Sequence, residues 1–173
     1  MTPEEMVDAA LRVADEGLAA GELPIGAVVV LGDEVVGRAY TQDKTRGRRL
    51  VHADLLAMEE ADETLGLARR PQPLRLAVTL EPCLMCLGAA MALGVSEVYY
   101  SLESPGDGAA GIAAAWTPGS ADMPWYRAPT VVGGIRRRDA RRQFRRYLDS
   151  AAESGFRRWA QTLADLPDRA PTA

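Results

Sequence analysis

The stretch 74-LRLAVTLEPCLMCLGAAMAL-93 decides the fold. Residues 74–80 are typical of a strand, and the apolar run at residues 83–93 predicts a helix. Pro82 suits the junction because it precedes the helix and has no N–H to lose. The spacing of Cys83 and Cys86 places both sulfur atoms at the mouth of this helix, where the helix dipole favours thiolates.

The chain contains a single histidine, His52, in the sequence His52-Ala53-Asp54 at the start of another predicted helix. One imidazole and two thiolates are a ligand set that tetrahedral Zn²⁺ accepts, and they leave the fourth position for a water. His52, Cys83 and Cys86 therefore predict a catalytic zinc site. The alternatives are that the cysteines form a redox pair or are two small core residues, and a bound zinc ion would exclude both.

The pattern H-x-E followed by P-C-x-x-C is the signature of zinc deaminases that act on cytosine or adenine, and this chain matches it except at the glutamate. On these residues, and on residues 21–30 and 79–83, the sequence resembles the cytidine/deoxycytidylate deaminase superfamily, in its nucleoside, guanine and tRNA adenosine deaminase branch. The resemblance implies a three-layer α/β/α sandwich with a mixed five-stranded sheet. It also implies a Zn²⁺ cofactor and release of ammonia by attack of a zinc-bound hydroxide.

The sequence departs from this family at the residue that shuttles the proton. The family has a glutamate two positions after the histidine, and this chain has Asp54. Aspartate reaches about 1.5 Å less far if the backbone is unchanged. Three interpretations stay open: a site rebuilt around Asp54, a weakened or silent site, or an aspartate that only caps or braces the helix.

A second departure concerns the base pocket. By resemblance, Thr41, Pro24 and Ile25 line this pocket, and Thr41 stands where the family has an asparagine that binds the base. Threonine offers one hydroxyl in place of an amide donor and acceptor. The segment at residues 46–51 also differs from the family pattern, so adenosine or guanine recognition does not carry over directly.

Hydrophobic periodicity and turn residues predict an alternation of strands and helices. The first helix starts at Pro3, after a Thr2 cap, and ends before Gly21. The expected strands are residues 25–31, 34–40, 74–80, 97–102 and 130–133. The further expected helices are residues 52–65, 83–93, 137–151 and 153–163. This alternation predicts a mixed sheet covered by helices on both faces.

Length and composition indicate the number of domains and the location of the protein. With 173 residues and 47% hydrophobic content, the chain predicts one domain over residues 1–165 and a flexible tail at 166–173. It shows no secretory signal and no membrane-length apolar run, so we expect a cytoplasmic protein. The resemblance adds a homodimer as the expected assembly.

Two further features have open interpretations. Arginines gather at residues 136–146, where four at helical spacing form either a solvated helix face or a phosphate-binding ridge: Arg138, Arg141, Arg142 and Arg145. Residues 101–129 predict a long loop that carries Trp116 and Trp125. This loop is a candidate lid or oligomer contact, and its tryptophans are equally compatible with core packing.

Three functions follow from these observations. The first is a zinc-dependent deaminase of a nucleobase, nucleoside or related heteroaromatic amine. The second is a tRNA adenosine-to-inosine deaminase, which the arginine cluster favours. The third is a zinc-containing nucleobase-binding protein with weak or no turnover, which Asp54 favours.

Overall fold

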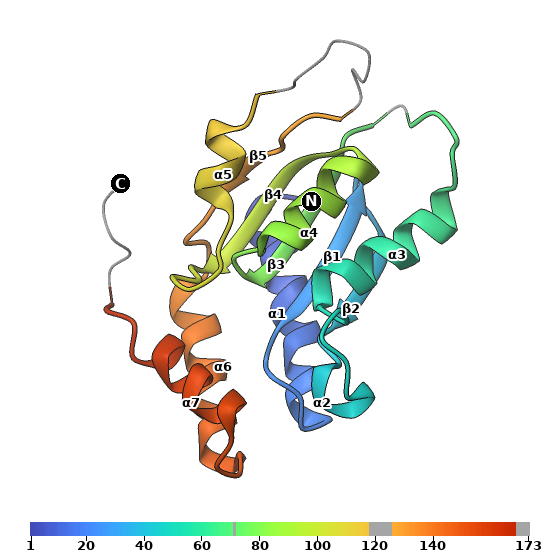
Figure 1. Cartoon of the computed structure of the whole chain (residues 1–173). Helices are drawn as coiled ribbons and strands as arrows, with labels where there is room; N and C mark the ends of the chain where they lie inside the picture. Colours follow the sequence, from blue (N-terminus) through green and yellow to red (C-terminus); the bar gives the residue numbers. More distant parts are fainter. Residues whose placement is uncertain (71, 118–125, 169–173) are drawn as a thin grey trace.

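The centre of the molecule is a five-stranded sheet in the order β2-β1-β3-β4-β5 (Figure 1). The computed structural model describes residues 1–70, 72–117 and 126–168. The strands are β1 (Gly26–Leu31), β2 (Glu34–Tyr40), β3 (Leu74–Leu80), β4 (Val95–Leu102) and β5 (Thr130–Val132). β1 is antiparallel to both β2 and β3, whereas β3, β4 and β5 are parallel, so the sheet is mixed as predicted.

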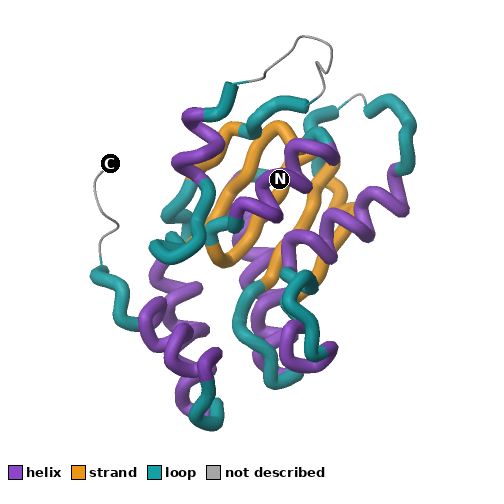
Figure 2. The backbone as a smooth tube through the Cα atoms, viewed as in Figure 1, coloured by secondary structure: helices purple, strands orange, loops and turns teal. Residues whose placement is uncertain are grey.

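Helices cover both faces of this sheet (Figure 2). One face carries α1 (Pro3–Ala19) and α6 (Arg137–Ser150), with α7 (Gly155–Ala164) packed on α6, and the other carries α3 (Ala53–Leu65) and α4 (Leu84–Leu93). The pleat of β1 separates the two cores, because Val28 faces the first set of helices and Val29 faces the second. The predicted three-layer α/β/α sandwich is thereby confirmed.

Close packing fixes α3 against the sheet edge. A Cβ atom at Gly37 would lie 2.1 Å from the carbonyl oxygen of Ala57, so β2 and α3 approach at a distance that only glycine allows. On the other face, Gly26 allows the same close approach to α1 at Ala10 and Ala14. α1 itself begins with the expected capping box between Thr2 and Glu5.

Two short helices differ from the sequence-based expectation. α2 (Asp43–Arg46) is a single turn that follows β2, and α5 (Ala110–Ala115) interrupts the predicted long loop. β4 also begins at Val95, two residues earlier than expected. Trp116 packs beside α5, in edge-to-face contact with Tyr126, whereas Trp125 lies outside the described residues. The described part of this loop therefore packs against α4, where Leu87 and Met91 complete a small third core.

The chain after α7 is tied back to α6 as far as it is described. The side chain of Arg137 donates to the carbonyl of Pro167 at 2.6 Å, and Arg141 pairs with Asp168. The first part of the predicted tail is thus held in place, and residues 169–173 lie outside the described part. No helix in the described ranges has the length and apolar character that a membrane span requires.

Candidate metal centre and cleft

Two helix starts bring the three predicted metal ligands together. His52 is the N-cap residue of α3, Cys83 is the N-cap residue of α4, and Cys86 lies in the first turn of α4. The Sγ atoms of Cys83 and Cys86 are 3.5 Å apart, and the Nδ1 atom of His52 lies 3.7 Å from the first and 3.6 Å from the second. We call these three residues the zinc trio.

These separations match a tetrahedral zinc site. Zn–S bonds of about 2.3 Å and Zn–N bonds of about 2.0–2.1 Å place the ligand atoms of a tetrahedron roughly 3.5–3.8 Å apart. All three distances between the ligand atoms fall in that range. Because only three protein ligands converge, the fourth position is left for a water or substrate.

Hydrogen bonds among the three side chains of the trio shift their pKa values. The hydrogen bond between the two cysteines is the main cause that lowers the pKa of Cys83 to about 4. The hydrogen bond between His52 and Cys83 raises the pKa of His52 to about 9, against the opposing effect of burial. The pKa of Cys86 is raised, first by its bond to Cys83 and then by burial. Zinc binding must therefore displace protons from His52 and Cys86.

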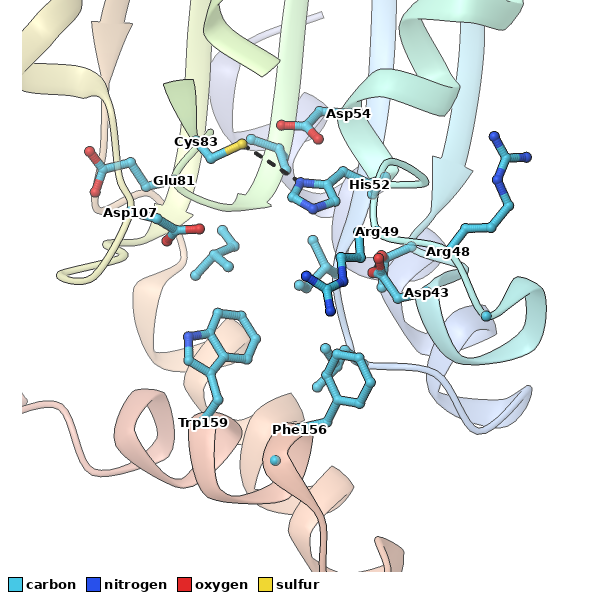
Figure 3. A pocket seen from close by; sticks show the side chains of 18 residues that line it. Asp43, Arg48, Arg49, His52, Asp54, Glu81, Cys83, Asp107, Phe156 and Trp159 are labelled. Atoms are coloured by element: carbon cyan, nitrogen blue, oxygen red, sulfur yellow. Dashed lines mark hydrogen bonds between the residues drawn. The ribbon is translucent and has the colours of Figure 1, made fainter. Parts of the chain in front are cut away.

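Asp54 lies beside the trio at the same end of the cleft (Figure 3). Its side chain is only 5% exposed, and burial raises the pKa of its carboxyl. The nearby Cys86 thiol and the charge of His52 act in the opposite direction. A carboxyl group with a raised pKa at this place is suited to taking up and releasing a proton.

The trio opens into a cleft of about 730 Å³. His52 and Cys83 line it, whereas Cys86 is fully buried. Phe156 and Trp159 of α7 face the trio across the cleft, and we call them the aromatic wall (Figure 3). Trp159 is held by an edge-to-face contact with Phe144 of α6, at a ring-centroid distance of 6.1 Å. The cleft thus pairs a metal-binding end with a flat apolar surface, as a planar heteroaromatic ligand requires.

The predicted base-pocket residues are placed in different ways. Thr41 and Ile25 line the cleft, whereas Pro24 is buried behind it and its carbonyl accepts a hydrogen bond from Thr79 at 3.3 Å. The hydroxyl of Thr41 donates to the carboxylate of Asp43, which also lines the cleft. Any contact of Thr41 with a base must therefore compete with Asp43.

Glu81 fixes the opposite side of the cleft. Its carboxylate accepts backbone N–H bonds from Ser104 and Ala110, each at 3.0 Å. A Cβ atom at Gly108 would lie 2.3 Å from this carboxylate, so a larger residue there would have to displace Glu81 from its two bonds. Ser104 in turn donates its hydroxyl to the carboxylate of Asp107, an exposed acidic residue that lines the cleft.

The arginines of α6 are largely neutralised within the protein. Of the predicted ridge, Arg141 is buried and pairs with Asp168, and Arg142 pairs with Asp139 at 2.5 Å. Neighbouring arginines pair with carboxylates of α1 and of the segment after β4: Arg136 with Asp8, Arg146 with Asp15, and Arg137 with Glu103. Most of this cluster therefore has internal counter-charges, which weakens the phosphate-ridge interpretation.

Several cleft residues were not singled out from the sequence. Phe156 and Trp159 fall at helical spacing, which is also the pattern of an ordinary core stripe. Arg49 and Asp43 lie near the trio only because the chain folds back between β2 and α3. In the sequence, only the departure of residues 46–51 from the family pattern indicates that this segment is unusual.

Comparison with known proteins places the trio in a family. A family model described as the cytidine and deoxycytidylate deaminase zinc-binding region matches residues 1–102, which include the trio and Asp54. A tRNA-specific adenosine deaminase of Bacillus subtilis (strain 168) is 38% identical over 112 residues, covering 64% of this chain and 69% of the relative. The aromatic wall lies outside the matched range.

A second relative is a much longer protein. A tRNA(Ile)-lysidine synthase of Deinococcus radiodurans is 38% identical over 140 residues, which cover 79% of this chain and 23% of that protein. This chain therefore spans less than a third of the length of that relative.

Two solved structures are similar at the level of the fold and sequence. One comes from a study of A-to-I editing by tRNA:A34 deaminases, with a TM-score of 0.68 and 29% identity over 80% of this chain and 98% of the other. The other is guanine deaminase from Bacillus subtilis, with a TM-score of 0.54 and 30% identity over 60% of this chain and 66% of the other.

Proposed function

The chain belongs to the cytidine and deoxycytidylate deaminase family, and from that premise we propose that it is a zinc-dependent aminohydrolase. Its substrate would be a nucleobase, a nucleoside or a related heteroaromatic amine. The reaction consumes one water, replaces the ring amine by an oxygen and releases ammonia. The observation that carries this proposal is the trio geometry, with ligand atoms 3.5–3.7 Å apart and an open position next to the cleft.

His52, Cys83 and Cys86 would hold the metal at the end of the cleft. A bound zinc ion supplies an activated water for attack on the ring carbon that carries the amine. The two α-helix N-termini that present the trio favour its thiolates through their dipoles. Only three residues are engaged, so the substrate can approach from the cleft side.

Asp54 would move the protons. In this role its carboxylate would take a proton from the attacking water and deliver it to a ring nitrogen, and would then pass the remaining proton of the added hydroxyl to the amine, which leaves as ammonia. Its burial and raised pKa support the role, because the carboxyl holds a transferred proton more readily than an exposed aspartate does. The shorter side chain requires a substrate seated closer to α3 than a glutamate would.

The substrate class rests on the cleft. A volume of about 730 Å³ accommodates a base with its sugar, and the aromatic wall offers a stacking surface. A tRNA adenosine is the second candidate, because the relatives in Bacillus subtilis and in the tRNA:A34 deaminase study act on transfer RNA. The ion-paired state of the α6 arginines gives this second candidate less support from the structure.

Ammonia release tests the proposal. Purified protein is stripped with a chelator, one part is reloaded with Zn²⁺, and both are assayed on aminopurines, aminopyrimidines, their nucleosides and aminotriazines. We expect ammonia from the reloaded protein alone. Ligand binding without any ammonia from this panel or from tRNA would instead identify a silent binding protein and would refute the enzyme proposal.

A further inference from the structure

The loop between β2 and α3, residues 42–51, carries three exposed arginines: Arg46, Arg48 and Arg49. None of them forms an ion pair with a carboxylate in residues 1–70, 72–117 or 126–168. The arginines of α6, in contrast, mostly have acidic partners within the protein. We call residues 42–51 the arginine loop, and its positive charge is available for a ligand.

The arginine loop is anchored in the core of the protein. Glu22 is fully buried, and its carboxylate accepts the backbone N–H of Lys44 at 3.1 Å and that of Thr45 at 2.6 Å. The ends of the loop are joined by a bond from the Gln42 N–H to the Val51 carbonyl at 3.1 Å. A loop held at its base in this way presents its side chains without a large ordering cost.

The loop places one arginine inside the cleft. Both Arg48 and Arg49 line the cleft, and Figure 3 shows the guanidinium of Arg49 between His52 and Phe156, whereas Arg48 extends outward. Two acidic side chains, Glu81 and Asp107, lie on the opposite side of the cleft (Figure 3). Asp43 is the one acidic residue of the arginine loop, but the loop also carries Lys44 and three arginines, so its net charge is positive. An anionic group would therefore be attracted to the Arg49 side and repelled from the Asp107 side.

We propose that Arg49, with Arg48 as the outer partner, binds a phosphate ester carried by the substrate. The guanidinium fork matches phosphate oxygens in a bidentate geometry and keeps its charge at every physiological pH. The heteroaromatic base would lie between the zinc trio and the aromatic wall, and the sugar would lead toward Arg49. This inference rests on the proposed deaminase function and narrows its substrate class from any base or nucleoside to a nucleotide unit.

Two sources supply this chemistry: a nucleoside 5′-monophosphate, or a phosphodiester of RNA around the reacting base. Direct binding distinguishes them without turnover. Zinc-loaded Asp54→Asn protein is titrated in a calorimeter with adenosine, guanosine and cytidine, with the 5′-monophosphate of each, and with RNA hairpins that carry each base in the loop. The same titrations are repeated with Arg49→Ala added, and with Arg145→Ala added as the matched control.

Arg145 is a suitable control because it is also exposed, forms no ion pair within the described ranges and lies on α6 outside the cleft. We expect one phosphorylated ligand to bind roughly tenfold or more tightly than its nucleoside, since hydrogen bonds to charged groups have energies of this order. The preference should disappear with Arg49→Ala and persist with Arg145→Ala. Arg49→Lys should retain part of it, because the charge remains and the fork is lost.

Each outcome has a distinct meaning. Preference for a mononucleotide identifies a free nucleotide as the source, and preference for a hairpin alone identifies RNA. Equal binding of nucleoside and nucleotide, or a preference that survives Arg49→Ala, overturns the phosphate inference. Ammonia release from unphosphorylated substrates by the wild-type protein would show that the deaminase function stands even then.

Discussion

The zinc trio and the arginine loop lie at the same cleft but are specified in different ways. The trio comes from two short motifs, each at the start of a helix, and the Cys83–Cys86 distance follows from the first turn of α4, whereas His52 reaches both sulfur atoms because α3 packs beside α4. The arginine loop depends on a distant buried carboxylate, Glu22, that holds its backbone. In the proposed function, the metal chemistry therefore rests on residues that two local motifs identify, and substrate selection rests on residues that only tertiary structure brings to the cleft.

Removing a metal ligand should have the largest effect. Cys86→Ala takes away one of three ligands in a fully buried position, so we expect zinc content near zero and a loss of ammonia release of more than about a hundredfold. Elemental analysis and the ammonia assay on the same preparation check this. Met85→Ala, on the adjacent and partly buried position of α4, serves as the control and should keep its zinc.

If Cys86→Ala lost its zinc and still released ammonia, the trio would not take part in the reaction. The contrast between a catalytic zinc trio and a substrate-selecting arginine loop would then be wrong.

The aromatic wall should show a smaller effect of a different kind. Phe156 is 41% exposed and lines the cleft, so Phe156→Ala removes a stacking surface with little loss of core packing. Stacking of a base contributes about 1–3 kcal/mol, which predicts roughly a tenfold rise in KM with a nearly unchanged kcat. Leu67→Ala, at a fully exposed apolar residue remote from the cleft, should leave both constants unchanged. Equal effects of the two variants would remove α7 from the binding site.

The smallest expected effect concerns the ion pair that holds α6, and with it α7, against the sheet. Arg137 hydrogen-bonds to Glu103 and lowers the pKa of that carboxyl. Because the folded pKa is lowered, the pair stabilises the fold above the ordinary glutamate pKa of about 4.3, and this stability is lost as pH falls through the folded value. We expect Arg137→Gln to lower the free energy of unfolding by about 1–2 kcal/mol at neutral pH.

Urea unfolding of metal-free protein at several pH values measures this difference without a contribution from zinc release. The difference between wild type and Arg137→Gln should shrink below about pH 4. Arg146→Gln breaks an exposed pair with Asp15 and should cost less than about 0.5 kcal/mol. A pH-independent cost at Arg137 would point to lost packing in place of the charge pair.

The sequence was sufficient where structure is local. The strands Glu34–Tyr40 and Leu74–Leu80 have their predicted bounds, because alternating and apolar runs between turn residues define them. The starts of α3 and α4 lie within one residue of the prediction, so each ligand stands at the helix end where the sequence placed it. The single domain, the cytoplasmic location and the homodimer stay predictions.

Local sequence patterns did not predict the elements that depend on long-range contacts. The single turn of α2 is held by the carboxylate of Glu22, some twenty residues earlier in the chain, and no periodicity marks it. α5 is stabilised by Leu87 and Met91 of α4, to which it packs through Ala113. The direction in which Phe156 faces depends on how α7 crosses α6, which the amphipathic pattern alone does not define.

One kinetic comparison tests the division of the cleft most directly. With the best substrate of the ammonia panel, kcat and KM are measured for zinc-loaded wild type, Asp54→Asn and Arg49→Ala. We predict that Asp54→Asn lowers kcat by about a hundredfold or more with little change in KM, and that Arg49→Ala raises KM with kcat nearly unchanged. Equal losses of kcat in both variants, or full activity of Asp54→Asn, would contradict the account.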